Sequence, residues 1–177
     1  MDLGVISVRY ARALLKSASE LNNEDAVCRD MLCLGRCYLE VPQLRSAIAN
    51  PMLQADKKEA LLVTATGSEP TELTRRFLAL VLKEGRENAL QFMAASYVTL
   101  YRKQKNITCG RLITATAVTP AIEEKMRQMV ESKTRGTVEF NTEVNPDIIG
   151  GFILEYDTYR MDASVKSGLR KILAELK

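Results

Sequence analysis

Residues 88–117 read NALQFMAASYVTLYRKQKNITCGRLITATA, and within this stretch the spacing of apolar residues changes from a helical to a strand pattern. Before Lys105, apolar residues recur every three or four positions, which is typical of a helix with one buried face. After Lys105 they alternate with threonine and other polar residues, which is typical of a half-buried strand. The sequence therefore predicts an α-helical part up to residue 105 and a part with β-structure from residue 106.

The first hundred residues are predicted to form helices separated by short breaks. The expected helices cover residues 6–21, 24–40, 43–49, 55–64, 71–83 and 88–104. Val41-Pro42 and Asn50-Pro51 end two of them, because a proline moves the preceding residue out of the helical region. Helices joined by such short connections predict a six-helix bundle over residues 1–105.

Residues 106–177 are predicted to form a small α+β domain. Strands are expected over residues 107–117, 138–144 and 148–156, with a helix after Thr119-Pro120 and a last helix capped by Asp162 or Ser164. The second and third strands are joined closely, so we expect them to be antiparallel. The predicted fold class is therefore α+β, mostly α.

Composition argues against several classes of function. The chain has 25 lysine and arginine residues against 22 acidic ones among 177, and this net charge of +3 forms no basic stripe that would bind nucleic acid. Histidine is absent and no Cys-x-x-Cys pair occurs, so we expect no metal and no cofactor. No apolar run is long enough for a membrane span, so we expect no direct membrane insertion.

No arrangement of residues suits catalysis. The neighbours Glu24-Asp25 and Glu123-Glu124 diverge by about 100° on a helix, so each pair cannot converge on one substrate. No serine has a histidine partner that could activate it. Gly150-Gly151 lies in a strand pattern without phosphate-loop spacing, and glycine there more often marks a bulge or a close backbone approach. We therefore expect a protein that is not an enzyme.

Two predicted helices carry more apolar surface than a surface helix needs. Projection at 100° per residue gives apolar arcs of about 220° for residues 6–21 and about 200° for residues 71–83. A helix on the outside of a bundle needs only about 100° or somewhat more. Either both helices are central in the bundle, or a groove between them accepts an apolar helix from a partner.

Short motifs occur in order along nearly the whole chain. They are Val8 to Leu14 (VRYARAL), Asn50-Pro51, Arg76-Phe77-Leu78 with Lys83 to Arg86 (KEGR), Tyr97 to Tyr101, Ile149-Gly150-Gly151-Phe152, and Asp162-Ala163-Ser164-Val165 with Leu169. In this order and at this spacing the chain resembles the δ subunit of F-type ATP synthases, called the oligomycin-sensitivity-conferring protein in mitochondria. One departure is KEGR, where many members have Glu-Asn-x-Arg.

The resemblance implies a non-catalytic stator link between the catalytic α/β head and the peripheral stalk, through which rotor torque is coupled to ATP synthesis. Residues 1–105 would bind the N-terminal helix of an α subunit in the groove between the first and fifth helices. Residues 106–177 would bind the C-terminal ends of the b subunits. The family pattern and the helical projection together assign the groove to Tyr10, Ala13, Leu14, Ser17, Phe77 and Val81. The family also implies a peripheral location on the cytoplasmic face of the bacterial inner membrane.

An alternative from another class is a helical adaptor module that binds amphipathic peptides in an unrelated complex. It accounts for the broad apolar arcs but not for the spacing of Gly150-Gly151 and Asp162-Ala163-Ser164-Val165. The groove hypothesis also carries a specific expectation, namely that Leu14→Asp or Phe77→Asp weakens binding of a peptide from the α subunit without unfolding the bundle.

Overall fold

A computed structural model describes residues 3–67, 69–134, 136–156 and 158–175 of the chain. The chain divides into two compact units, residues 1–101 and 102–177, each with a hydrophobic core of its own. The division falls within the sixth helix, a few residues before the boundary expected at 105/106.

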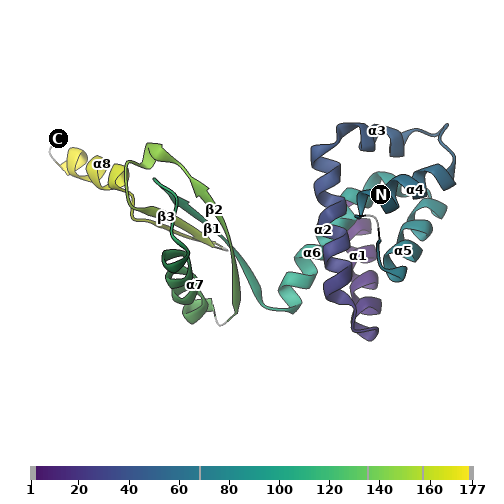
Figure 1. The fold of residues 1–177 in the computed structure, drawn as a ribbon, viewed down its shortest axis with the longest axis horizontal. Coiled ribbons are helices and arrows are strands. Elements are labelled where there is room, and N and C mark those ends of the chain that lie inside the picture. The colour runs from purple at the N-terminus through teal and green to yellow at the C-terminus, as the bar shows by residue number, and fades with distance from the viewer. Residues whose placement is uncertain (1–2, 68, 135, 157, 176–177) are drawn as a thin grey trace. The chain divides into compact units, whose positions relative to one another are not determined.

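The described part of the first unit is built from six α-helices with short connections (Figure 1). These are α1 (Leu3–Glu20), α2 (Glu24–Glu40), α3 (Pro42–Ala49), α4 (Ala55–Ala65), α5 (Glu72–Lys83) and α6 (Leu90–Gln104), with a 3-10 turn, η1 (Glu87–Ala89), before α6. The predicted helices are confirmed to within a few residues. The largest difference is at the start of α1, which begins at Leu3 instead of residue 6.

A buried carboxylate on α2 holds the start of α5. The Oδ2 atom of Asp30 accepts hydrogen bonds from the backbone N–H of Thr71 at 2.9 Å, from the Thr71 hydroxyl at 3.0 Å and from the Thr74 hydroxyl at 2.7 Å. The Thr71 side chain in turn caps α5 by accepting a hydrogen bond from the Thr74 N–H at 3.2 Å. A negative charge beside a helix N-terminus also complements the helix dipole. Asp30 thus fixes the position of α5 against α2.

Replacing this carboxylate is expected to destabilise the bundle. Asp30→Ala leaves several donors near the start of α5 without their acceptor, so we expect a loss of about 3 kcal/mol in the free energy of unfolding, measured by urea titration. A matched control is Glu72→Ala, which removes an exposed carboxylate that pairs with Arg76 at 3.0 Å and should cost less than about 0.5 kcal/mol. Equal losses in the two variants would mean that the Asp30 contacts do not stabilise the fold.

The second unit is a four-stranded sheet with helices at one face and one end (Figure 1). Its elements are β1 (Ile107–Thr114), α7 (Pro120–Thr134), β2 (Thr137–Val144), the 3-10 turn η2 (Pro146–Ile148), β3 (Phe152–Tyr156), β4 (Tyr159–Asp162) and α8 (Val165–Glu175). The strand order is β2-β1-β3-β4, with β1 and β2 parallel and the other pairs antiparallel. A parallel pair needs a crossover connection, which α7 supplies.

The sheet differs from the sequence-based expectation in four ways. The first strand ends at Thr114 instead of residue 117. The strands β2 and β3 run in opposite directions as expected, but they are not neighbours, because β1 lies between them. The expected strand over residues 148–156 begins only at Phe152, because residues 146–148 form η2. The edge strand β4 was not expected; its four residues alternate between apolar and charged side chains, but the run is short and all four are exposed.

The two faces of this sheet have different surroundings. On one face, α7 covers a core formed by Leu112, Val130, Val138 and Leu154. On the opposite face a smaller cluster contains Ile113, Ile148 and Ile153. Charged side chains also lie on that second face, where Arg111, Glu155 and Arg160 are register partners across three strands.

Candidate subunit-binding surfaces

Helices α1 and α5 contact each other through two aromatic side chains. The rings of Tyr10 and Phe77 lie edge to face, with centroids 6.5 Å apart and an interplanar angle of 67°. Such a geometry is favourable for an aromatic pair. The two helices whose apolar arcs are broadest in the sequence are therefore neighbours in the fold.

Apolar stripes extend from this aromatic contact along both helices. On α1, Ile6, Tyr10, Ala13 and Ser17 follow one another at spacings of four and three residues, which places them on one side of the helix. On α5, Leu73, Phe77 and Leu80 share such a side. We call these two stripes the α1/α5 surface. It is not fully covered by its own chain, because Ala13 is exposed and the Leu80 side chain is 48% exposed.

The six residues expected to line the groove have unequal access to a partner. Leu14, Phe77 and Val81 belong to the buried core, with exposed fractions of 4%, 7% and 0%. Tyr10 and Ser17 are half-buried and Ala13 is exposed. The first three residues can therefore support the α1/α5 surface from below, whereas the other three can meet a partner directly.

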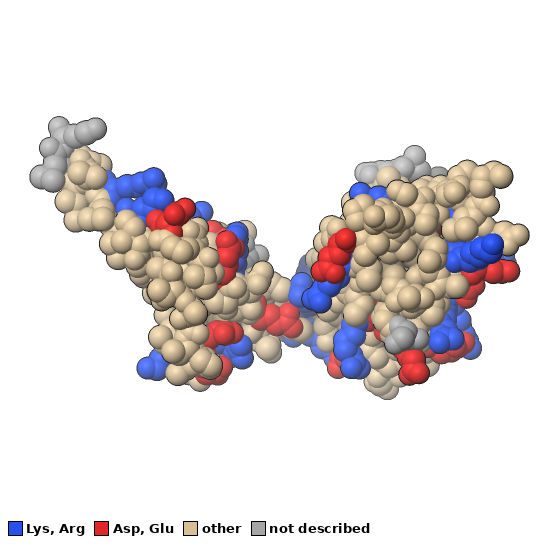
Figure 2. Space-filling view, turned by 45° about the horizontal axis from the view of Figure 1, so that its top comes forward, with Lys and Arg blue, Asp and Glu red and all other residues tan. Residues whose placement is uncertain are grey.

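Basic residues follow one margin of this surface on α1. A shallow hollow along the helix is lined by Gly4, Val5, Val8, Arg9, Arg12, Ala13 and Lys16. Ala13 belongs both to this hollow and to the α1/α5 surface, so the basic side chains lie beside the apolar stripe. Figure 2 shows an uncharged area on the viewed face of the first unit, with charged side chains of both signs around it.

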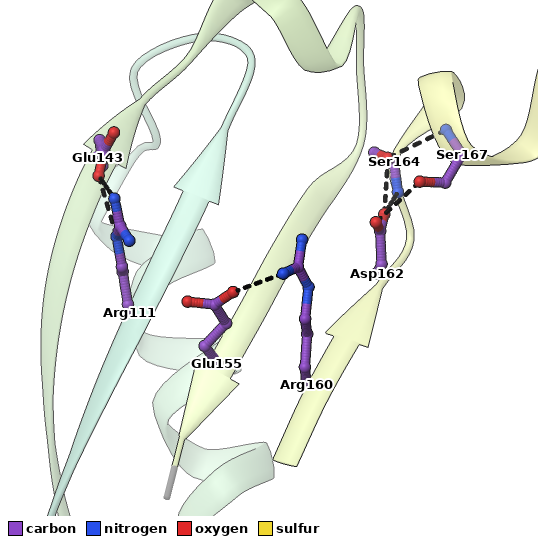
Figure 3. A network of polar contacts seen from close by, with 7 residues as sticks. All are labelled: Arg111, Glu143, Glu155, Arg160, Asp162, Ser164 and Ser167. Atoms are coloured by element: carbon purple, nitrogen blue, oxygen red, sulfur yellow. Dashed lines mark hydrogen bonds and ion pairs between the residues drawn. The ribbon is translucent and has the colours of Figure 1, made fainter. Parts of the chain in front are cut away.

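In the second unit, the charged side chains of the open sheet face are paired with one another (Figure 3). The guanidinium of Arg111 donates to Glu143, with a distance of 2.9 Å from Nε to Oε2, and Arg160 pairs with Glu155 at 3.3 Å. The hydrogen bond and charge of Glu143 raise the pKa of Arg111 above its usual value. Within each of these two pairs the opposite charges neutralise each other.

The motif Asp162-Ala163-Ser164-Val165 fixes the start of α8 through side-chain hydrogen bonds (Figure 3). Asp162 accepts hydrogen bonds from the Ser164 hydroxyl at 2.6 Å, the Ser164 N–H at 3.0 Å and the Ser167 hydroxyl at 2.8 Å. These contacts lower the pKa of Asp162 to about 2. Ser164 caps α8 by accepting from the Ser167 N–H at 3.2 Å, so of the two expected caps Ser164 is the direct one and Asp162 supports it.

The glycine pair brings the start of α8 against the sheet. Gly151 has a φ of +75°, and a Cβ atom there would overlap the carbonyl oxygen of Ala163. The backbone N–H of Val165 donates to the carbonyl of Gly150 at 3.0 Å. The expected close backbone approach is confirmed, although the two glycines precede β3 instead of lying inside a strand.

The acidic neighbours Glu123 and Glu124 and the buried Lys58 are engaged in ion pairs. Glu123 and Glu124 both pair with Arg127, at 3.3 and 3.4 Å, and the buried Lys58 pairs with Glu87 at 2.8 Å. Within the described ranges, no group of three or more His, Cys, Asp or Glu side chains is placed to hold a metal ion. No described helix has the length and apolar character needed to cross a membrane.

Three features of the structure were missed by the sequence reasoning. Asp30 fixes α5 through hydrogen bonds to residues more than 40 positions away, and the sequence holds no signal for such a contact. Ile149 has a φ of +70°, which is unfavourable for a β-branched residue, and its place directly before Gly150-Gly151 is the only hint in the sequence. Helix α8 was expected to be amphipathic, but its sequence does not reveal that its apolar stripe is exposed.

Comparisons with known proteins identify the family. A sequence model of the ATP synthase delta (OSCP) subunit matches residues 6–176. The chain is 45% identical over 173 residues to ATP synthase subunit delta of Phocaeicola vulgatus, covering 97% of this chain and 94% of that protein. It is 42% identical over 172 residues to ATP synthase subunit delta of Parabacteroides distasonis, covering 97% and 96%.

The fold is also found in a solved structure. A chain in the cryo-EM structure of the Toxoplasma gondii mitochondrial ATP synthase hexamer superposes with a TM-score of 0.69 at 20% identity, covering 96% of both chains. The family match extends across both units, which an adaptor from an unrelated complex would not explain. The chain therefore belongs to the ATP synthase delta (OSCP) subunit family.

Proposed function

We propose that this chain, a non-catalytic delta subunit of the peripheral stalk of an F-type ATP synthase, joins the catalytic head to the stalk by using its two units for different partners. The first unit, residues 1–105, binds the N-terminal helix of an α subunit at the α1/α5 surface. The second, residues 106–177, binds the C-terminal ends of the b subunits. The protein lies peripherally at the cytoplasmic face of the bacterial inner membrane, and it holds the head against the torque of the rotor.

The pair of apolar stripes on α1 and α5 is the observation that carries this proposal. Tyr10 and Phe77 join the stripes, and Ala13 and Leu80 leave apolar surface uncovered on either side. A helix laid along two such stripes buries apolar side chains at regular helical spacing. Complete burial of a leucine-sized side chain contributes about 1.5–3 kcal/mol, so a few contacts can exceed the entropy cost of association.

Basic residues flank both stripes. Arg9, Arg12 and Lys16 line the hollow beside the α1 stripe, and on α5 the exposed Arg76 lies three residues after Leu73 and four before Leu80. An amphipathic helix with acidic residues along its margins would complement these charges. The six predicted residues then divide into a floor of Leu14, Phe77 and Val81 and a contact layer of Tyr10, Ala13 and Ser17.

The proposal is tested by calorimetric titration of the full-length protein with a synthetic peptide that has the sequence of the N-terminal helix of the α subunit. We expect saturable one-to-one binding with a negative heat-capacity change, which marks burial of apolar surface. A control peptide with its apolar positions changed to serine should not bind. If the unmodified peptide shows no binding at about 100 μM, equivalent to a binding free energy weaker than about 5.5 kcal/mol, the part of the proposal that concerns the catalytic head is wrong.

A further inference from the structure

A cavity of about 270 Å³ lies in the first unit, where the end of α2, the second half of α3, the turn η1 and the first turn of α6 meet. The described residues that line it come from these four elements alone, so the cavity is separate from the α1/α5 surface. The lining includes Tyr38, Arg45, Ile48, Glu87, Gln91 and Phe92.

Tyr38, which lines the cavity, has a buried hydroxyl group without a partner. The residue is only 4% exposed, and its Oη atom makes no hydrogen bond to any described residue. Burial, reinforced by the negative charge of Glu87, raises the pKa of Tyr38 to about 12, so the hydroxyl keeps its proton at neutral pH. Because buried polar groups are nearly always hydrogen-bonded, this hydroxyl is a donor that lacks its acceptor.

Glu87 also lines the cavity and has one carboxylate oxygen without a partner. Its Oε1 atom accepts a hydrogen bond from Lys58 Nζ at 2.8 Å, whereas its Oε2 atom is buried and has no partner among the described residues. Burial opposes ionisation, but hydrogen bonds and the charge of Lys58 outweigh it, so the pKa of Glu87 lies below its usual value. The Oε2 atom of this carboxylate is therefore an acceptor that lacks its donor.

A single hydroxyl group can satisfy both of these atoms. It accepts a hydrogen bond from Tyr38 Oη and donates its own hydrogen to Glu87 Oε2. A water molecule can do the same, but one water needs only about 10–15 Å³, so a cavity of about 270 Å³ leaves most of its volume to other atoms. This volume is just below the range of about 300–1,000 Å³ found for drug-sized ligands, which favours a smaller molecule.

The surplus charge at the cavity is positive. Lys58 and Glu87 neutralise each other, whereas the guanidinium of Arg45 donates to the uncharged Oε1 atom of Gln91 at 2.8 Å. A guanidinium has five N–H donors and can bind a carboxylate or a phosphate through two of them at once. Arg45 is exposed and Phe92 is 53% exposed, so the cavity opens to solvent beside a group suited to an anion.

We propose that this cavity, called here the Tyr38/Glu87 cavity, binds a small organic anion that carries a hydroxyl group. The hydroxyl of the ligand lies between Tyr38 Oη and Glu87 Oε2, its carboxylate or phosphate pairs with Arg45, and its short carbon skeleton packs against Phe92. The site goes beyond the proposed function and does not depend on it, because the cavity and the α1/α5 surface are formed by different helices.

The test is an NMR titration of the full-length ¹⁵N-labelled protein with racemic malate, with succinate and with glycerol 3-phosphate. Succinate is the matched control ligand, because it differs from malate only by the missing hydroxyl group. We expect malate or glycerol 3-phosphate to shift the amide signals of residues 38, 45–49 and 87–92 saturably, with a Kd of about 1 mM or below. Succinate should bind at least about threefold more weakly than malate. The tighter of the two hydroxylated ligands identifies the anionic group as a carboxylate or a phosphate.

Three variants test the contacts. Tyr38→Phe removes only the unpartnered hydroxyl, so it should keep or raise the urea midpoint of unfolding while the affinity for the ligand falls at least about threefold. Arg45→Gln should lower the affinity at least about tenfold, because it removes the charge that pairs with the anion. The matched control is Arg36→Gln, which removes the same charge from a side chain of α2 that is 77% exposed and outside the lining, and it should keep the affinity.

Each outcome decides for or against the site. Shifts at the cavity residues that weaken in Tyr38→Phe and Arg45→Gln, but not in Arg36→Gln, support it. If neither malate nor glycerol 3-phosphate shifts these signals at about 10 mM, the cavity holds only water and the proposal is wrong. It is also wrong if succinate binds as tightly as malate, or if Arg36→Gln lowers the affinity as much as Arg45→Gln. None of these failures would affect the proposed function, because binding of the α-subunit peptide is expected to be the same with and without malate.

Discussion

Leu80→Asp in the full-length protein is expected to weaken binding of the N-terminal peptide of the α subunit at least about tenfold, which corresponds to about 1.4 kcal/mol. Leu80 is 48% exposed, so covering the rest of its side chain contributes roughly half of the 1.5–3 kcal/mol of a complete burial. A carboxylate at this position would in addition have to lose water beneath the partner helix. Calorimetric titration gives the affinity, and circular dichroism during heating shows whether the bundle remains folded.

The same helix offers a matched control. Ala79→Asp introduces the same charge one residue earlier, about 100° around α5 and outside the Leu73–Phe77–Leu80 stripe. Ala79 is exposed, so the control should keep the affinity of the unmodified protein. Ala13→Asp on α1 is expected to act like Leu80→Asp, because Ala13 belongs to the facing stripe. Binding that is insensitive to both Ala13→Asp and Leu80→Asp would place the binding site of the peptide elsewhere.

These substitutions replace the two that the sequence alone suggested. Leu14→Asp and Phe77→Asp were expected to weaken binding without unfolding the bundle, but both side chains lie in the core, 4% and 7% exposed. A carboxylate in either position would be buried without a partner, which costs several kcal/mol. Their burial instead predicts that both substitutions destabilise the bundle, because a helical projection gives the direction of a side chain but not how deeply its neighbours cover it.

The bundle could be predicted more completely than the sheet, for a physical reason. A helix is stabilised by contacts three and four residues apart, so the stripe containing Met93, Ala94 and Tyr97 and the prolines at 42 and 51 reveal where helices begin and end. A sheet depends on pairing between distant segments. The alternation around residues 138–144 indicates a strand, but it does not say that β1 lies between β2 and β3.

The binding surfaces show the same limit. The apolar arcs of α1 and α5 can be derived from spacing, and so can the amphipathic character of α8. The contact between Tyr10 and Phe77 joins residues 67 positions apart, and the exposure of Leu169 depends on the absence of a covering element among the described residues. The close approach at Gly150-Gly151 was predictable because two adjacent glycines are rare in a strand pattern without a backbone reason.

Gly151→Ala is expected to destabilise the second unit by about 3 kcal/mol or more, a large loss of stability for a single methyl group. The φ of +75° at Gly151 is unfavourable for alanine, and the added Cβ would overlap the Ala163 carbonyl oxygen and approach the Ser164 Cα atom within 3.2 Å. All of these neighbours are backbone atoms, so no side chain can rotate away. Hydrogen exchange of the β3 amide groups measures the free energy of opening in this unit.

A second glycine in the same unit separates steric overlap from the general effect of adding a methyl group. Gly168 lies inside α8 and has no atom near the position of an added Cβ, so Gly168→Ala should stabilise the helix by about 0.5–1 kcal/mol. The two variants are therefore expected to change stability in opposite directions, although each adds one methyl group. If Gly151→Ala leaves hydrogen exchange unaltered, the segment 149–151 can move away from residues 163–164 without loss. The start of α8 would then not be fixed by the glycine pair.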